Sequence, residues 1–335
     1  MRELGVGMRW IMIGGVMAIA LGGLPLAVSA QDTPVPEQIV NVMNKLWGSH
    51  PGLRANHAKG IVAEGSFTPT AEAAGLSTAV LFQSGTTTPV TVRFSDATGV
   101  PDLPDGDSNA NPHGMAIEFQ QSDGAEVDVV TNSLGFFPVA TGEDFRDLLT
   151  AASESGPDAA KPTKLETFVA SHPAVKAAGG TVATPVSFAT DIYNGINAFM
   201  FVDAAGKRQP FRFRLEPVGG AQHLSKEDAA KQQPNFLIDE LPARVAKEPV
   251  AFRLQARLAA PGDPTGDATK AWPDDRKLVD LGTVTLTAVP ADGGARSASL
   301  LYLPGNLTDG IEVSDDPLID TRNEAYAVSF ERRSE

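Results

Sequence analysis

The clearest structural signal in the chain is Met115-Ala-Ile-Glu-Phe-Gln-Gln-Ser-Asp-Gly-Ala-Glu-Val-Asp-Val-Val-Thr131. Residues 115–119 and 126–131 have the alternating, β-branched pattern of strands. Asp123-Gly124 between them is typical of a tight hairpin turn, because both residue types tolerate the backbone angles that such turns need. A hairpin joins antiparallel neighbours, so this stretch predicts an antiparallel sheet at the centre of the fold.

Further strands and helices are expected on both sides of this hairpin. Strand patterns occur at residues 60–67, 89–95, 199–203, 209–216, 250–258 and 277–289. Apolar residues at helical spacing, with Pro near the start and Gly at the end, predict a helix at residues 36–48. Helices are also expected at residues 142–153, 161–178, 224–248 with a break near Pro234, and 320–332. Strands interspersed with helices indicate an α+β fold around an antiparallel sheet or barrel. Residues 96–113, rich in Gly, Pro, Asp and Asn, are expected to form a long surface loop.

The first thirty residues are expected to be a secretory signal peptide. Arg2 and Arg9 precede a short apolar run, which is followed by a Gly/Pro stretch and small residues at Val28 and Ala30. An uncleaved membrane anchor is the alternative, but the apolar run is shorter than the ~20 residues that span a bilayer. The remaining residues, 31–335, are predicted to be a single exported domain, periplasmic or secreted, with no membrane association after cleavage.

The composition excludes several kinds of chemistry. The 335 residues include no cysteine, which rules out disulfides, cysteine zinc sites, thiolate-ligated haem and cysteine nucleophiles. The 41 acidic residues outnumber the 27 basic ones, which argues against nucleic acid or an anionic membrane as a partner. Nucleotide binding and serine hydrolysis have no support either, because the chain lacks a Gly-rich phosphate loop and a Gly-x-Ser-x-Gly elbow.

Metal sites built from side chains alone have weak signals. None of the five histidines pairs with another at helical spacing, although a zinc site assembled from distant histidines stays open. Asp102, Asp105 and Asp107 with Asn109 are calcium-type ligands without the spacing of a calcium loop. A solvated loop is the preferred interpretation of these carboxylates.

Short segments elsewhere in the chain are more informative together than singly. Alone, His57 is most simply a core histidine, and Arg322 with Tyr326 is a packed aromatic beside an arginine stem on one helix face. The segments are Arg54-Ala-Asn-His57-Ala-Lys-Gly60, Val92-Arg93-Phe94-Ser95, Asp128-Val-Val-Thr-Asn132-Ser-Leu-Gly-Phe-Phe137 and Gly310-Ile-Glu-Val-Ser-Asp-Asp-Pro-Leu-Ile-Asp-Thr-Arg322-Asn-Glu-Ala-Tyr326. In order and spacing they resemble the haem catalases, particularly the small exported catalase-related peroxidases, over about residues 40–335.

The resemblance implies a catalase-like β-barrel with surrounding helices and a C-terminal helix that carries the haem ligand. Tyr326 is then the axial ligand of the haem iron, through its phenolate oxygen. A tyrosine titrates near ~10 in water, so a cation must help to hold the anion, and Arg322 one turn earlier is placed to do so.

The distal side is implied in the same way. His57 corresponds to the histidine that moves a proton during heterolytic cleavage of the O–O bond, and Ser95 to the serine that fixes its tautomer. Asn132 is the candidate for the amide that orients peroxide. Thr131 is the alternative, because an ungapped alignment on Phe136-Phe137 places it at that position, and neighbouring side chains in a strand face opposite ways.

Other positions are expected to hold the cofactor. Arg54 and Arg93 correspond to arginines that bind the haem propionates, for which a planar guanidinium is well suited. Phe136 and Phe137 are expected to line the pocket. Without cysteine the cofactor is expected to be non-covalent haem b.

The implied function is reduction of hydrogen peroxide or organic peroxides by a small organic reductant, with weak or no catalase activity. The sequence lacks the long amino-terminal arm and the carboxy-terminal helices of full-length catalases. The resemblance therefore does not support bound NADPH or an interlocked tetramer, and a monomer or small homo-oligomer is expected. Two rival interpretations are a haem enzyme that rearranges fatty-acid hydroperoxides, as allene oxide synthases do, and a non-catalytic exported barrel that binds a small apolar ligand.

Overall fold

The predicted hairpin lies in the wall of a closed barrel. In the computed structural model, β3 (Gly114–Gln120) pairs antiparallel with β4 (Glu126–Asn132), and Glu118 lies opposite Asp128. On its other edge β3 pairs with β2 (Thr88–Ser95), and β2 pairs with β1 (Gly60–Pro69). The predicted strand boundaries in this half of the barrel are confirmed to within two residues.

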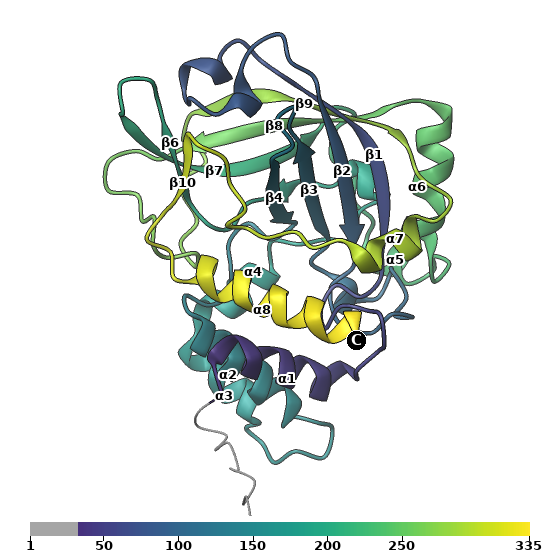
Figure 1. Cartoon of the computed structure of the whole chain (residues 1–335). Helices are drawn as coiled ribbons and strands as arrows, with labels where there is room; N and C mark the ends of the chain where they lie inside the picture. Colours follow the sequence, from purple (N-terminus) through teal and green to yellow (C-terminus); the bar gives the residue numbers. More distant parts are fainter. Residues whose placement is uncertain (1–32) are drawn as a thin grey trace, which may run out of the picture. The chain divides into compact units, whose positions relative to one another are not determined.

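The remaining strands close the ring. They are β5 (Tyr193–Asn194), β7 (Arg208–Pro217), β8 (Val250–Leu258) and β9 (Leu278–Ala288). The hydrogen-bonded order β1-β2-β3-β4-β5-β7-β8-β9 returns to β1, and every pairing in it is antiparallel. Two further strands, β6 (Phe199–Val202) and β10 (Ile311–Val313), extend the sheet beside β7. The predicted α+β fold around an antiparallel barrel is confirmed (Figure 1).

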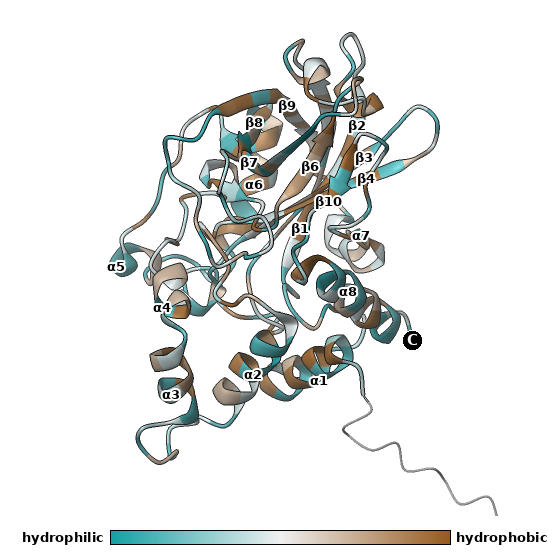
Figure 2. Cartoon of the chain, turned by 90° about the vertical axis from the view of Figure 1, so that its left-hand side faces the viewer, coloured by the Kyte–Doolittle hydropathy of each residue, from teal (hydrophilic) through white to brown (hydrophobic). Residues whose placement is uncertain are grey.

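Aromatic side chains fill the barrel. Phe67, Phe94, Phe119 and Phe252 are fully buried, each on a different strand of the ring. Figure 2 shows the hydrophobic colour concentrated along the strands, whereas the short helix α5 (Lys226–Ala229) is hydrophilic. Because successive side chains of a strand face opposite ways, the interior receives alternate residues, and the barrel is a packed core rather than a channel.

Three helices form a second apolar cluster outside the barrel. They are α1 (Val35–Trp47), α2 (Gly142–Ser153) and α8 (Leu318–Ser334), which crosses below the strands in Figure 1. Ile39, Met43, Leu149 and Ala325 are the buried contacts between them. All three helices were predicted, and α1 ends where Gly48 adopts a φ of 86°.

The other helices differ from expectation in detail. Residues 161–178 form two helices, α3 (Lys164–Ser171) and α4 (Pro173–Gly179), because Pro173 has no backbone N–H to continue the first. Residues 224–248 divide into α5 and α6 (Phe236–Lys247) as predicted, whereas α7 (Gly293–Ser299) was not predicted. Single 3-10 turns occur at Ala73–Gly75, Val80–Phe82, Ser108–Ala110 and Phe188–Thr190.

The prediction that residues 96–113 form a surface loop is confirmed only in part. The segment contains no strand or α-helix, and Asp102 and Asn109 are exposed, but several of its polar side chains are buried. Asp96, Asp105 and His113 in this segment are at most 1% exposed. The Lys59 ammonium binds the Asp105 carboxylate, and the other Asp105 oxygen accepts the backbone N–H of Leu237 at 2.7 Å. A charged loop can be buried when each carboxylate finds such partners, so Asp105 is not part of a solvated loop.

The structure describes residues 33–335, of which Pro34–Glu335 form one compact unit. The expected signal peptide, residues 1–30, lies outside the described residues. Within the described part no helix is both long and apolar enough to cross a membrane. In the same residues no three histidine or acidic side chains are grouped closely enough to hold a metal ion.

Candidate active site

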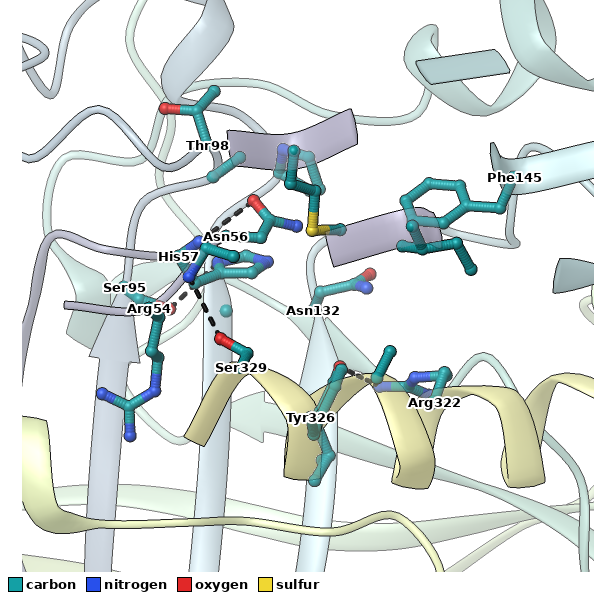
Figure 3. A pocket seen from close by; sticks show the side chains of 18 of the residues that line it. Arg54, Asn56, His57, Ser95, Thr98, Asn132, Phe145, Arg322, Tyr326 and Ser329 are labelled. Atoms are coloured by element: carbon teal, nitrogen blue, oxygen red, sulfur yellow. Dashed lines mark hydrogen bonds between the residues drawn. The ribbon is translucent and has the colours of Figure 1, made fainter. Parts of the chain in front are cut away.

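A cavity of about 530 Å³ brings most of the predicted site residues together. Its lining includes the ends of β2 to β4, helices α1, α2 and α8, and the segment that precedes β1. Figure 3 shows His57 and Asn132 on one side of the cavity, with Tyr326 and Arg322 of α8 on the other. The volume lies within the range of cavities that hold small molecules and cofactors.

Helix α8 presents one polar face to this cavity. Besides Thr321, four polar side chains on it line the cavity at intervals of four, three and four residues, which places them on the same side of the helix: Arg322, Tyr326, Ser329 and Arg333. Arg322 Nη2 donates to Tyr326 Oη at 3.0 Å, and the guanidinium carbon lies 5.5 Å from the centre of the tyrosine ring. Arg322 Nη1 donates to Asn197, whose amide nitrogen donates to Asp316 at 2.8 Å. The Arg322 charge is therefore fixed beside the phenol by a second chain segment.

His57 is held against β2 by its ring and by its backbone. Ser95 Oγ lies 3.1 Å from His57 Nδ1, and Arg93 Nη2 donates to the His57 carbonyl at 2.7 Å. His57 has a positive φ of 56°, which is uncommon for a residue with a side chain and is found most often at functional sites. Gly114 makes room for this arrangement, because a Cβ there would lie 2.7 Å from Ser95 Oγ.

The surroundings keep His57 uncharged. Burial lowers the pKa of its imidazole to about 3, and the positive charges of Arg93, Arg54 and Arg322 add to the effect. A neutral imidazole with Nδ1 turned to Ser95 has Nε2 as its remaining ring nitrogen, so it can act as a proton acceptor at neutral pH.

The two candidates for the distal polar residue differ in their hydrogen bonds. Thr131 Oγ1 donates to the Met115 carbonyl at 2.6 Å, which commits its one hydroxyl hydrogen to the barrel wall. Asn132 Oδ1 accepts the backbone N–H of Leu134 at 2.9 Å, a bond that uses only the accepting end of the amide. Both residues line the cavity, and Figure 3 shows the Asn132 amide within it.

Three arginines gather at one end of the cavity without an acidic partner. Arg54 Nη2 and Arg333 Nη2 each donate to the Leu300 carbonyl at 2.6 Å, and Arg93 Nε donates to Ser297 Oγ at 2.6 Å. No carboxylate among residues 33–335 lies within ion-pair distance of these three guanidinium groups. Burial lowers the pKa of Arg54 to about 10, and burial together with repulsion from Arg54 lowers that of Arg333 to about 9. A bound ligand with negative charges would relieve this excess.

These residues fit the haem that the sequence resemblance implies. Tyr326 offers an oxygen ligand beside a cation, the three arginines suit two propionates, and apolar side chains supply the surface that a flat macrocycle needs. The apolar lining includes Ile39, Met43, Phe145, Leu149, Ile196 and Leu318.

Only one of the two phenylalanines that were predicted to line the pocket does so. Phe137 lines the cavity, and its ring lies 5.3 Å from that of Phe145 on α2. Phe136 is not among the lining residues. The pair follows β4 in an irregular segment, and the backbone N–H of Phe137 donates to the Ala268 carbonyl, which fixes which of the two rings turns inward.

Several pocket residues were not anticipated from sequence. Arg333 was detectable in principle, since it lies two helical turns after Tyr326 on the same face. Ser329 Oγ accepts the backbone N–H of Ala55 at 3.1 Å and so ties α8 to the segment that carries His57. Tyr302 also lines the cavity, and Ser297 hydrogen-bonds the lining residues Arg54 and Arg93. Both come from a region that was predicted neither as helix nor as site.

Comparisons with known proteins agree on one family. A family model described as Catalase matches residues 50–334. The catalase-related peroxidase of Mycolicibacterium paratuberculosis is 35% identical over 303 residues, which cover 89% of this chain and 95% of that protein. The catalase-related peroxidase of Synechococcus elongatus is 32% identical over 330 residues, which cover 97% and 96%.

Longer proteins match over part of their length. Catalase-2 of Arabidopsis thaliana is 26% identical over 294 residues, and the match spans 58% of that protein. A solved structure described as that of a bacterial catalase superposes with a TM-score of 0.74 at 22% identity, covering 98% of this chain and 68% of that one. This last likeness concerns the fold.

Proposed function

This chain belongs to the catalase family and is an oxidoreductase that acts on peroxide, and we propose that it is a haem peroxidase supplied by a small organic reductant. Family membership implies a haem cofactor, and the absence of cysteine favours non-covalent haem b. The observation that carries the proposal is the placement of the Arg322–Tyr326 pair and the Ser95–His57 pair in one cavity. Hydrogen peroxide and organic peroxides are the proposed substrates, with weak or no catalase activity.

On the α8 side, the chain's residues would hold the cofactor. Haem supplies a redox-active iron at which peroxide is reduced. Tyr326 would hold the iron through its phenolate oxygen, and Arg322 would stabilise that negative charge from the same helix face. The proposed partners of the propionates are Arg54, Arg93 and Arg333. Their positive charges are not neutralised by any carboxylate of the described residues, so bound propionates would stabilise them.

On the opposite side, His57 is the proposed proton carrier. Its neutral imidazole accepts a proton from the peroxide at Nε2 and returns it to the departing oxygen, so that water or an alcohol leaves. Ser95 keeps Nδ1 engaged and thereby fixes which nitrogen does this work. The Asn132 amide nitrogen is the proposed donor that orients the peroxide.

A reductant other than a second peroxide molecule is supported by two observations. The relatives that match over nearly their whole length carry the name peroxidase, whereas the proteins named catalase match over little more than half. In addition, α1 and α2 give the cavity an apolar wall that includes Ile39, Met43 and Phe145. Such a wall favours contact with aromatic or other organic reductants.

The absorption spectrum and the fate of peroxide test this function. The purified haem-loaded protein should show a high-spin ferric Soret band of a tyrosinate-ligated haem and should oxidise aromatic reductants in proportion to the peroxide consumed. Rapid oxygen evolution without reductant oxidation would overturn the peroxidase proposal in favour of dismutation. Consumption of a lipid hydroperoxide without any reductant would indicate a rearrangement, and a colourless protein in haem-supplemented cells would indicate a non-catalytic barrel.

The cellular setting remains part of the proposal. We propose export to the periplasm or medium after cleavage of residues 1–30, and a monomer or small homo-oligomer that binds no NADPH. Mass determination of the protein from the periplasmic fraction, together with size-exclusion chromatography with light scattering, tests these points. A cytoplasmic chain that retains residue 1 would contradict export.

A further inference from the structure

Behind the wall that carries His57 and Ser95 lies a buried histidine that the catalytic proposal does not use. His113 is fully buried, and neither of its ring nitrogens makes a hydrogen bond. Both carboxylate oxygens of Asp96, which is 1% exposed, also lack hydrogen bonds. An unsatisfied buried polar group costs about 1–3 kcal/mol, so two together call for a functional explanation.

These two residues belong to an alternating line of histidines and aspartates. His113 Nε2 lies 3.5 Å from Asp96 Oδ1, and His113 Nδ1 lies 3.8 Å from Asp191 Oδ2. The second Asp191 oxygen lies 2.9 Å from His223 Nε2. Each gap at His113 is less than 1 Å longer than a normal hydrogen bond, so a small ring rotation closes either one.

The outer end of the line reaches solvent. The His223 side chain is 34% exposed, whereas that of Asp191 is 4% exposed. The backbone of His223 forms an isolated bridge with Pro185, which holds the histidine over Asp191. Protons can therefore exchange between water and His223 without any opening of the barrel.

The inner end lies directly behind the distal pair. Asp96 follows Ser95 in the chain, and its backbone lies near enough to the His57 ring to oppose part of the lowering of the pKa of that imidazole. Gly114, the residue after His113, has no side chain, and a Cβ there would lie 3.3 Å from the His57 ring. A positive charge on His57 would lower the pKa of His113, because the two rings lie near each other.

The charged neighbours define where protons reside. Asp96 faces Asp105, Lys59 and Arg93, and its burial beside Asp105 raises the pKa of its carboxyl to about 8. His113 faces Asp96, Asp191, His57 and His223, and burial lowers the pKa of its imidazole to about 3.

At the outer end, the hydrogen bond to Asp191 raises the pKa of His223. Burial raises the pKa of Asp191, which is the partner of the His223 ring. At neutral pH the line therefore contains a protonated carboxyl at Asp96, a neutral imidazole at His113 and, at its outer end, a surface imidazole with a raised affinity for protons. Acids and bases alternate along it, as proton transfer requires.

We propose that His223, Asp191, His113 and Asp96 form a proton path from solvent to the wall behind His57. The need for it rests on the proposed peroxidase function. Reduction of a peroxide by an external reductant follows ROOH + 2 H⁺ + 2 e⁻ → ROH + H₂O, and an organic reductant that gives up electrons at a distance does not deliver its protons to the cavity. Dismutation of hydrogen peroxide takes up no protons overall. A proton path from solvent is therefore useful for reduction of peroxide by an external reductant but not for dismutation.

Infrared spectroscopy of the full-length haem protein tests the path without turnover. The wild type should show a protonated-carboxyl band that disappears in Asp96→Asn and shifts when H₂O is exchanged for D₂O. In His113→Leu the band should persist and its shift should slow by about tenfold or more, a smaller effect than the ~10²–10⁴ of a direct acid–base group. His113→Leu removes no hydrogen bond of the ring, and His113→Gln provides a polar second variant.

Two further variants sharpen the test. His223→Gln should slow the exchange, and added imidazole should restore it, because the site is open to solvent. His172→Gln is the matched control, since His172 lies at the start of α4 with its ring stacked on Phe168 at 3.9 Å, and it should exchange like the wild type. Unchanged exchange in both His113 variants, or no carboxyl band sensitive to Asp96→Asn, would overturn the path.

The outcome for the path is separable from that for the enzyme. Slowed exchange in a protein that oxidises no organic reductant would support the path and refute the peroxidase function. Reductant oxidation with unaffected exchange in the His113 variants would refute the path alone.

Discussion

Arg322 Nη2 lies 3.0 Å from Tyr326 Oη, one helical turn away on the same face of α8. Asn197, from a different part of the chain, holds the other end of the guanidinium. The cation is thus in place beside the phenol before any cofactor arrives, and a phenolate formed there gains a charge-assisted hydrogen bond at no cost in reorganisation. This preorganised pair is the basis of the first two predictions.

Tyr326→Phe removes the oxygen that we assign to the iron. We expect the purified variant to retain little or no haem, because the remaining contacts are to the rim and the apolar faces. The haem content per chain, from the Soret absorbance against protein concentration, measures this. Tyr302→Phe is the matched control, since Tyr302 also lines the cavity and its hydroxyl has no hydrogen-bond partner. A Tyr326→Phe protein with the wild-type spectrum would refute the axial assignment.

Arg322→Ala should change the electronic state of the haem without emptying the cavity. Loss of the neighbouring cation makes the phenolate a stronger base, so the Soret band and the reduction potential of the iron should both shift. Arg322→Lys should recover part of the shift, because it restores the charge but not the planar two-sided contact with Tyr326 and Asn197. Identical spectra and potentials in all three proteins would show that the arginine is only a packing residue.

His57→Ala should keep haem and slow the reaction with peroxide by about 10²–10⁴-fold, the usual scale for a lost general acid–base group. Stopped-flow absorbance after mixing with hydrogen peroxide gives this rate directly. A variant that reacts at the wild-type rate would exclude His57 as the proton carrier.

The pH dependence of that rate follows from the pKa of His57. Its pKa of about 3 lies below the ordinary value for an imidazole, so the neutral, proton-accepting form is present above that pH and is lost as the pH falls through it. In the wild type the bimolecular rate should be level from neutral pH down to about pH 4. A fall in the rate centred near pH 6.5, the ordinary histidine range, would contradict the effect of burial.

Substitution of Thr131 should lower mainly the stability of the protein, whereas substitution of Asn132 should lower mainly the rate of its reaction with peroxide. Thr131→Val removes the hydroxyl that bonds the Met115 carbonyl, so the free energy of unfolding should fall by about 1–2 kcal/mol in denaturant titrations. Asn132→Ala should instead lower the rate with peroxide roughly five- to tenfold, the equivalent of one hydrogen bond of about 1 kcal/mol. The opposite assignment of effects would make Thr131 the distal residue.

Local pattern was sufficient for most elements of this fold. The hairpin around Asp123-Gly124 and the helix that follows Thr141 were predictable because turn chemistry and helix capping act over a few residues. The split of residues 161–178 was predictable too, from Pro173, although the stretch was predicted as one helix.

Other features depend on partners that are distant in sequence. Residues 96–113 are polar, and their burial follows from Lys59 and from the start of α6, which no local signal connects to Asp105. Tyr302 likewise reaches the cavity, and Ser297 reaches Arg93, only through folding of the whole chain. The neighbours Phe136 and Phe137 are a further example. Only tertiary packing determines that Phe137 lines the cavity and Phe136 does not.

The two-residue strand β5 gives the barrel one short seam. Asn132 with Asn194 is the single β4–β5 pair, and two pairs join β5 to β7, whereas β3 and β4 share seven. Backbone amides along this seam should exchange with deuterium sooner than those of the other strands, because few ladder bonds need to break there. The barrel therefore has its fewest backbone hydrogen bonds at Asn132, the residue assigned to orient the substrate. Local opening of the barrel wall should occur first beside the active site.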